Sequence, residues 1–274
     1  DSLPSEFDGY VRIRTAEDLS ALKGDEKAVL VNDLSNAKAP FDWNGTLDGN
    51  GHTITSPQLW HMASSTSWIS SNYGIIRNLR FRNFSYSSDQ GSELGLVAGN
   101  YGTIENCVIL SGTLTGVCTD EPIKAGSIAA YNDKTGTITN CVNYASVSAK
   151  FEGDFKSAAY AGGICGFNSG TIRHCLNLGN VYAKSTRSLF IAGIAYSQAA
   201  FASNFDPIVS DCGNAGYVSG DIERLANRTY ETEYWRMILS NWASDGYATD
   251  KGTVSYITEV SLSTLLSMWS DVLN

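Results

Sequence analysis

The sequence holds few of the residues on which catalytic and metal sites depend. It has 3 His in 274 residues, and its 6 cysteines include no Cys-x-x-Cys pair, so a structural zinc site is not expected. Lys and Arg number 19 against 28 Asp and Glu, which gives a formal net charge of -9. Nucleic-acid binding needs a basic patch, so no nucleic-acid partner is expected. No run of 18 apolar residues occurs, and we expect no membrane-spanning segment.

The chain is also poor in charge and shows no leader. Charged residues make up 17% of it, and it starts at Asp1 without a signal peptide, as a mature or trimmed chain would. Export therefore cannot be read directly. The low charge and the abundance of Ser, Thr, Gly and Asn are typical of exported β-solenoids. They favour an extracellular or cell-surface location.

A repeated pattern organises the sequence. Residues 161–181 read Ala-Gly-Gly-Ile-Cys-Gly-Phe-Asn-Ser-Gly-Thr-Ile-Arg-His-Cys-Leu-Asn-Leu-Gly-Asn-Val, and the same pattern occurs at 94–107 and 125–141 and, more loosely, at 191–212. Short alternating runs separated by Gly, Asn and Ser indicate strands joined by turns. Three short strands per unit cannot close a core alone, whereas stacked units pair equivalent strands in parallel around a continuous interior.

Three repeat slots define the expected interior and one corner. An inward column contains Ile76, Ile104, Ile138 and Ile172, and a second contains Leu79, Cys107, Cys141, Cys175 and Cys212. We interpret these cysteines, and Cys165, as reduced core thiols, because cysteine packs as a small hydrophobe. Between the columns, Arg77 and Glu105 should point outward and pair. Asn78, Asn106 and Asn140 suit a left-handed corner where stacked amides could form a ladder.

The repeat resembles the GLUG-type repeat of bacterial surface and secreted proteins. The resemblance covers roughly residues 28–220, together with a closing helix near the C-terminus. It implies a right-handed parallel β-helix of the pectate-lyase-like shape, which we expect to have about six coils in a single all-β domain. The resemblance supplies no catalytic motif, and many members of the family are thought to be adhesins or accessory modules.

Caps are expected at both ends of the solenoid. Residues 1–27 form the N-terminal cap, with a helix that starts at Thr15, and residues 28–220 form the coils. Residues 221–274 form an aromatic-rich C-terminal cap, with a strand over 253–257 and a helix over 261–273 that should lie against the end of the solenoid. The run from Asp48 to His52 is Gly-rich, and we interpret it as a turn rather than a catalytic pair.

The loops that leave each third strand vary most, and they predict the binding edge. They span 86–93, 118–124, 150–156 and 184–190, and equivalent loops of a solenoid lie side by side. Exposed aromatics beside polar groups favour sugar or protein recognition. The candidate ligand-binding residues are Phe151, Phe155, Tyr160, Glu121 and Asp154.

Three functions remain open at this stage. The leading hypothesis is a noncatalytic adhesin-like module that binds a host or microbial glycan or a surface protein, with no catalytic residues. The second is a polysaccharide lyase or glycoside hydrolase, because the loops supply carboxylates and cations; its residues would be Asp89, Asp120, Asp154, Lys124 and Arg187. The third is a passive stalk. No cofactor is expected, although the same acidic edge could supply oxygen ligands for calcium.

Overall fold

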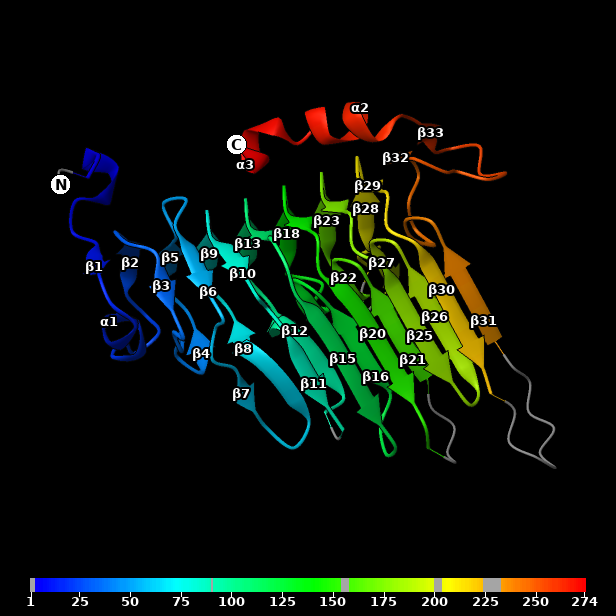
Figure 1. The fold of residues 1–274 in the computed structure, drawn as a ribbon, viewed down its shortest axis with the longest axis horizontal. Coiled ribbons are helices and arrows are strands. Elements are labelled where there is room, and N and C mark those ends of the chain that lie inside the picture. Colours follow the sequence, from blue (N-terminus) through cyan, green and yellow to red (C-terminus); the bar gives the residue numbers. More distant parts are fainter. Residues whose placement is uncertain (1–2, 90, 154–157, 200–203, 224–232) are drawn as a thin grey trace.

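The chain folds as an all-β parallel solenoid of about six coils, as predicted, and its described residues include three short α-helices (Figure 1). The computed structural model describes residues 3–89, 91–153, 158–199, 204–223 and 233–274. Equivalent strands of successive coils pair in parallel and build four sheets along the solenoid axis. Each central coil therefore contributes more than the three strands expected from the sequence.

The first sheet confirms the isoleucine column. Ile76, Ile104, Ile138 and Ile172 are paired in register and have no exposed surface. The sheet contains β1 (Val11–Ile13), β2 (Lys27–Leu30), β5 (Thr46–Asp48), β9 (Ile75–Arg77), β13 (Thr103–Glu105), β18 (Thr137–Thr139), β23 (Thr171–Arg173) and β28 (Ile208–Ser210). Because β1 pairs with β2, this sheet starts inside the segment expected to be the N-terminal cap.

The second sheet follows the first after a tight corner. It contains β3 (Leu34–Ser35), β6 (Thr53–Thr55), β10 (Arg80–Arg82), β14 (Val108–Ile109), β19 (Val142–Asn143), β24 (Leu176–Asn177), β29 (Gly213–Asn214), β32 (Tyr247–Ala248) and β33 (Thr258–Glu259). The strand predicted over 253–257 was wrong, because pairing with β32 begins only at Thr258. The five cysteines interpreted as core thiols are buried and unbridged, as predicted, and so is Cys118, for which no prediction was made.

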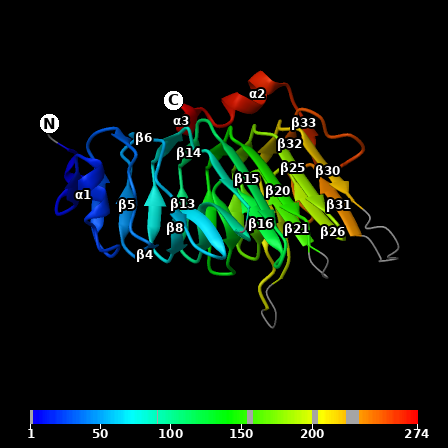
Figure 2. The ribbon, with the colours of Figure 1, turned by 60° about the horizontal axis from the view of Figure 1, so that its bottom comes forward.

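The third sheet and one half of the fourth form an arm that projects from the solenoid body (Figures 1 and 2). The third contains β11 (Tyr86–Ser88), β15 (Thr113–Cys118), β20 (Ser146–Phe151), β25 (Val181–Ser185) and β30 (Val218–Ile222). The fourth begins with the long strands β8 (Ser65–Asn72) and β12 (Glu93–Asn100). After β12 it divides into an arm half, β16 (Ile123–Gly126), β21 (Ala158–Gly162), β26 (Ser188–Ala192) and β31 (Glu233–Met237), and a body half, β17 (Ala129–Asn132), β22 (Cys165–Asn168) and β27 (Ala195–Ser197).

The arm has its own core, separate from the main one. Small and branched side chains of the two sheets form it. Val147 and Ala149 of the third sheet pack in it with Ala161 and Leu189 of the arm half of the fourth. The larger core lies between the first sheet, the second sheet and the body half. Two minor strands, β4 (Asp42–Trp43) and β7 (Trp60–His61), pair with β8, the latter antiparallel.

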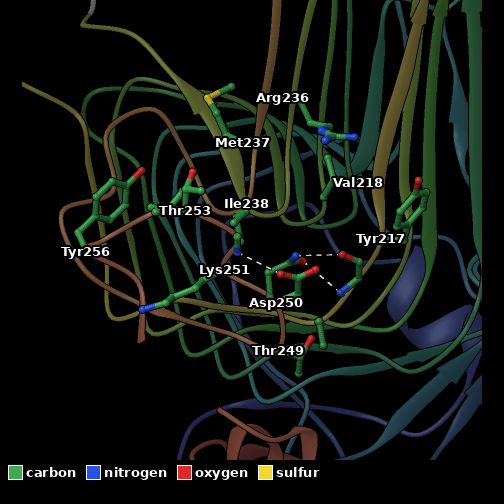
Figure 3. A pocket seen from close by; sticks show the side chains of 15 residues that line it. Tyr217, Val218, Arg236, Met237, Ile238, Thr249, Asp250, Lys251, Thr253 and Tyr256 are labelled. Carbon is green, nitrogen blue, oxygen red and sulfur yellow. Dashed lines mark hydrogen bonds between the residues drawn. The ribbon is translucent and has the colours of Figure 1, made fainter. Parts of the chain in front are cut away.

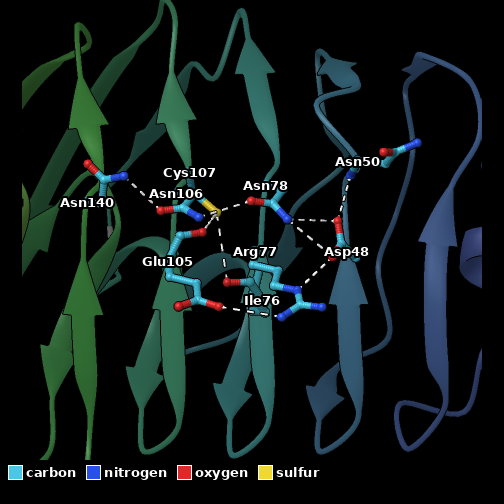
Figure 4. A network of polar contacts seen from close by, with 9 residues as sticks. All are labelled: Asp48, Asn50, Ile76, Arg77, Asn78, Glu105, Asn106, Cys107 and Asn140. Carbon is cyan, nitrogen blue, oxygen red and sulfur yellow. Dashed lines mark hydrogen bonds and ion pairs between the residues drawn. The ribbon is translucent and has the colours of Figure 1, made fainter. Parts of the chain in front are cut away.

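Corner residues carry the predicted left-handed backbone and amide ladder (Figure 4). Asn78, Asn106 and Asn140 have φ of 57°, 53° and 51°. Asn140 Nδ2 donates to Asn106 Oδ1 at 2.8 Å, and Asn106 Nδ2 donates to Asn78 Oδ1 at 3.2 Å. Arg77 reaches Glu105 at 3.8 Å, as predicted, and its Nε also donates to the buried carboxylate of Asp48 at 2.6 Å.

The terminal segments pack differently from each other. A 3-10 helix (Ser5–Phe7) precedes β1, and α1 (Ala16–Ser20) begins with the capping box between Thr15 and Asp18 that its sequence indicates. At the other end, α2 (Leu262–Ser267) and α3 (Ser270–Leu273) run back along the outside of the second sheet (Figure 1). Leu265, Trp269 and Val272 cover Val108, Val142 and Leu176 there. The expectation that this helix lies against the end of the solenoid was wrong.

Candidate functional site

The variable loops lie side by side at the tip of the arm, as predicted. Ser92 Oγ donates to Glu121 Oε2 of the next coil at 3.2 Å, and Thr186 Oγ1 donates to the carbonyl of Gly153 at 2.8 Å. These contacts join neighbouring tips in series. The tip is therefore a continuous edge, and Glu121 lies on it as an exposed side chain.

The structure does not assemble the catalytic alternative at this edge. Asp89 and Asp120 are exposed, and Thr119 Oγ1 donates to Asp120 at 3.1 Å. Lys124, predicted as a cationic partner for them, instead pairs with Glu93 at 3.1 Å. Arg187 is partly buried where β25 turns into β26 and donates its amide to Ser185 Oγ. Asp154 lies outside the described residues, among which no group of three His, Cys, Asp or Glu side chains could hold a metal ion.

The aromatic part of the predicted tip surface requires correction. Phe151 is the last residue of β20, points into the core of the arm and has no exposed surface. It therefore cannot contact a ligand in this structure. Phe155 lies outside the described residues. Tyr160 is half-buried in β21, on the outer face of the arm half rather than in the loop.

Tyr160 belongs instead to a larger set of aromatic rings on the outer face of the fourth sheet. Tyr73 stacks on Tyr101 with centroids 5.0 Å apart, and Tyr101 lies 6.4 Å from Tyr131. Tyr131 lies 6.1 Å from Phe167, which lies 5.7 Å from Tyr196. We call these five residues, from successive coils, the aromatic row.

Two further rings extend the row onto the arm half. Tyr160 meets Phe167 edge to face at 5.2 Å and stacks on Phe190 at 4.9 Å. Tyr160 stands on the arm half and Phe167 on the body half, on either side of a bend in the chain. Because their rings meet across this bend, the outer face is concave where the two halves join. Glycine allows this bend, because a Cβ at Gly162 would overlap the carbonyl of Cys165.

Buried amides hold the strands of the row in register. A ladder of fully buried asparagines lies beneath the rings, and each side chain donates to the next at 2.8 Å; its members are Asn72, Asn100, Asn132 and Asn168. Each amide thus satisfies a neighbour that would otherwise be buried without a partner. Tyr101 follows its ladder residue in the sequence, whereas Tyr131 precedes its own. The Tyr101 ring fits only because residue 99 is glycine, since a Cβ there would lie 2.9 Å from the ring.

Two charged groups beside the row, Lys124 and Asp133, already have partners. Lys124 Nζ contacts Glu93 and lies 5.7 Å above the Tyr131 ring. Tyr131 donates its hydroxyl to Asp133 at 3.0 Å. Burial, reinforced by this hydrogen bond, raises the pKa of Tyr131 to about 12. Burial alone would raise the pKa of Asp133, but hydrogen bonds from Thr135 and Tyr131 lower it. The row therefore presents neutral phenols and phenyl rings at neutral pH.

A pocket of about 550 Å³ opens at the last coil (Figure 3). It lies between the turn after β29, the end of β31 and residues 249–256. Arg236 and Lys251 stand on opposite sides of it in Figure 3, and Asp250 uses its carboxylate to accept the amide of Gly252. These charges do not converge on one point, so the pocket offers weaker grounds for a specific site than the row does.

Sequence reasoning missed the row, although a signal was present. In each coil an aromatic residue adjoins the buried polar ladder position: Asn72-Tyr73, Asn100-Tyr101, Tyr131-Asn132, Phe167-Asn168 and Tyr196-Ser197. The side of the ladder on which the ring stands changes between the second and third pairs. A search at one fixed spacing therefore does not align all five.

Comparison with known proteins establishes the fold and little more. No known protein family matches the chain, so the GLUG resemblance is not confirmed. The chain is 30% identical over 136 residues to Halomucin of Haloquadratum walsbyi (strain DSM 16790 / HBSQ001), a match that covers 41% of this chain and 1% of Halomucin. A crystal structure from Bacteroides ovatus, provisionally described as an immunoglobulin A1 protease, superposes with a TM-score of 0.60. It covers 96% of this chain and 87% of its own at 18% identity, which supports the shared fold alone. No helix among the described residues is long and apolar enough to cross a membrane.

Proposed function

We propose that this chain is a noncatalytic, adhesin-like module, extracellular or on a bacterial cell surface, that binds a glycan or a surface protein. One observation carries the proposal: five aromatic rings from successive coils form an unbroken row on one outer face. None of the five rings belongs to the buried core of the solenoid body, and each keeps part of its surface exposed. Half-buried aromatics with polar groups beside them are typical of recognition surfaces.

The exposure of the row supports recognition as well as local packing. Tyr73 at its first end is 55% exposed, and Tyr101, Tyr131, Phe167 and Tyr196 are each partly exposed. Large side chains with two rotatable bonds lose little entropy when they bind a partner. A partner that covered the row would bury apolar ring surface while the Tyr131 hydroxyl stayed hydrogen-bonded to Asp133.

The test is to incubate the purified chain with an array of host and microbial polysaccharides and glycoproteins, with and without calcium. Retained protein and loss of glycan are both measured. Retention without glycan loss is expected, and a Tyr131→Ala, Phe167→Ala double variant should lose it. Tyr144→Ala is the matched control, because Tyr144 is 41% exposed and follows β19, outside the row. Glycan cleavage, or retention that the double variant leaves intact, would contradict the proposal.

A further inference from the structure

The spacing of the aromatic row carries information about the shape of its ligand. Neighbouring coils of a parallel solenoid are about 4.8 Å apart, so five rings on successive coils span roughly 19 Å along the axis. The row is one ring wide from Tyr73 to Tyr131, and the pair Tyr160 and Phe190 widens it beside Phe167 and Tyr196. A ligand that used the whole row would be long, narrow and repetitive at about the spacing of the coils.

The tilt of the rings leaves aromatic faces uncovered. Successive planes in the middle of the row differ by 70°, 41° and 60°, and only Tyr73 and Tyr101 stack nearly parallel. A continuous parallel stack would hide every inner face behind the next ring. Tilted rings instead present part of a face outward, and the C–H face of a pyranose packs against such a surface.

The charges beside the row disfavour an acidic ligand. Lys124 is the basic side chain that the described contacts place there, and Glu93 already neutralises it at 3.1 Å. Asp133 keeps its negative charge, since its pKa is lowered, and the whole chain has a net charge of -9. A uronate or sulfate would have to approach the carboxylates of Glu93 and Asp133, and Lys124, the cation that lies over the Tyr131 ring, is already paired.

We infer that the aromatic row binds a neutral, linear glycan laid parallel to the solenoid axis, with about one sugar to each coil; this rests on the proposed binding function. A pyranose in an extended chain advances by nearly the rise of one coil, so sugars and rings stay in step. A protein partner fits less well. Stable protein interfaces bury about 800 Å² on each side around a central cluster, whereas this row is a narrow strip.

The experiment is calorimetric titration of the intact chain with neutral β-1,4-linked oligosaccharides of glucose, xylose, mannose and N-acetylglucosamine, from two to six sugars long. Affinity for the best series should rise with each sugar up to about the four or five that the row spans, then level off. Tyr131→Ala should weaken binding about tenfold, as for the loss of a central aromatic contact. Tyr144→Ala should change it less than twofold. Raising the salt concentration should have little effect, since charge attraction is not involved.

A second variant separates a positional effect from misfolding. Tyr73→Ala removes an exposed end ring, so it should weaken only the longest oligosaccharides and leave the shortest unchanged. Circular dichroism of each variant checks that the solenoid is intact. Binding of polygalacturonate, heparan sulfate or a protein that the same ring variants abolish would overturn the neutral-glycan inference and leave the proposed function standing. Failure of every ligand to depend on the row would overturn both.

Discussion

The arm tip and the concave outer face of the fourth sheet are two surfaces of the same coils, and they are built by different means. At the tip, neighbouring loops touch through a few hydrogen bonds, such as those from Ser92 Oγ to Glu121 and from Glu152 N to the carbonyl of Cys118. On the concave face, each ring belongs to a residue that lies on a paired strand or is next in sequence to a residue of the buried ladder. Position at the tip therefore depends on each loop, whereas position on the face is fixed by the repeat.

This difference shows where a solenoid can place a precise binding surface. A loop must lose backbone entropy when it orders around a ligand, and that cost reduces affinity. The strands of the aromatic row are already ordered by their hydrogen bonds. A repeated ligand can then contact equivalent side chains at each coil without further ordering.

The largest effect should come from Phe151, which was expected at the tip surface and lies in the arm core. Replacing a fully buried Phe with Ala costs about 3–5 kcal/mol through lost burial and the cavity left behind. Phe151→Ala should lower the free energy of unfolding by that amount, measured by urea denaturation. The variant that remains folded should bind as the parent does, because Phe151 lies in the arm core on β20 of the third sheet, whereas the row lies on the outer face of the fourth sheet.

Phe151→Leu serves as the control, since it keeps most of the buried volume and should cost less than half as much. If Phe151→Ala left stability unchanged and removed binding, Phe151 would belong to a contact surface. The distinction between tip and concave face would then be reversed.

A smaller loss is expected at Asn132, beneath the middle of the row. Asn132→Ala removes the buried hydrogen bonds that its side chain makes with Asn100, Asn168 and the carbonyl of Gly136, at about 1 kcal/mol for each bond. We expect roughly 3 kcal/mol lower stability and weaker glycan binding together, measured by denaturation and calorimetry. Asn106→Ala, in the partly exposed corner ladder, should cost about 1 kcal/mol and leave binding unchanged. Equal losses at both sites would show that burial does not distinguish the ladders.

The sequence was sufficient to predict those features that recur in one slot. Ile104 and Ile138 occupy a fixed register, as do Cys107 and Cys141, so their common burial follows directly from the repeat. The left-handed corner was predictable for a local reason, because Asn tolerates positive φ. These features need only neighbouring coils and no distant contact.

The features that sequence reasoning missed depend on strand boundaries or on distant packing. Val147, Ala149 and Phe151 alternate with polar residues, so Phe151 continues an inward face, but the strand was expected to end before it. The helical spacing near Trp269 predicted a helix without its location. Its site on the second sheet depends on outward apolar residues such as Leu176, which a single sequence does not distinguish from inward ones.

The smallest expected effect concerns charge beside the row, and it depends on pH. Hydrogen bonds lower the pKa of Asp133 in the folded chain below the value of about 3.9 for an unfolded aspartate. Its ionised form therefore stabilises the fold above that value, and the contribution disappears as pH falls through the lower, folded-state pKa.

Asp133→Asn should cost less than about 1 kcal/mol at pH 7, because the group is partly exposed, and nothing measurable near pH 2. The matched change at the tip, Asp120→Asn, should stay within about 0.5 kcal/mol at both pH values, as for an ordinary surface charge. Urea denaturation at the two pH values measures both. A loss at Asp133 that persisted undiminished at low pH would mean that the carboxylate acts through hydrogen-bond geometry alone, and that the concave face, like the tip, gains nothing from its charge.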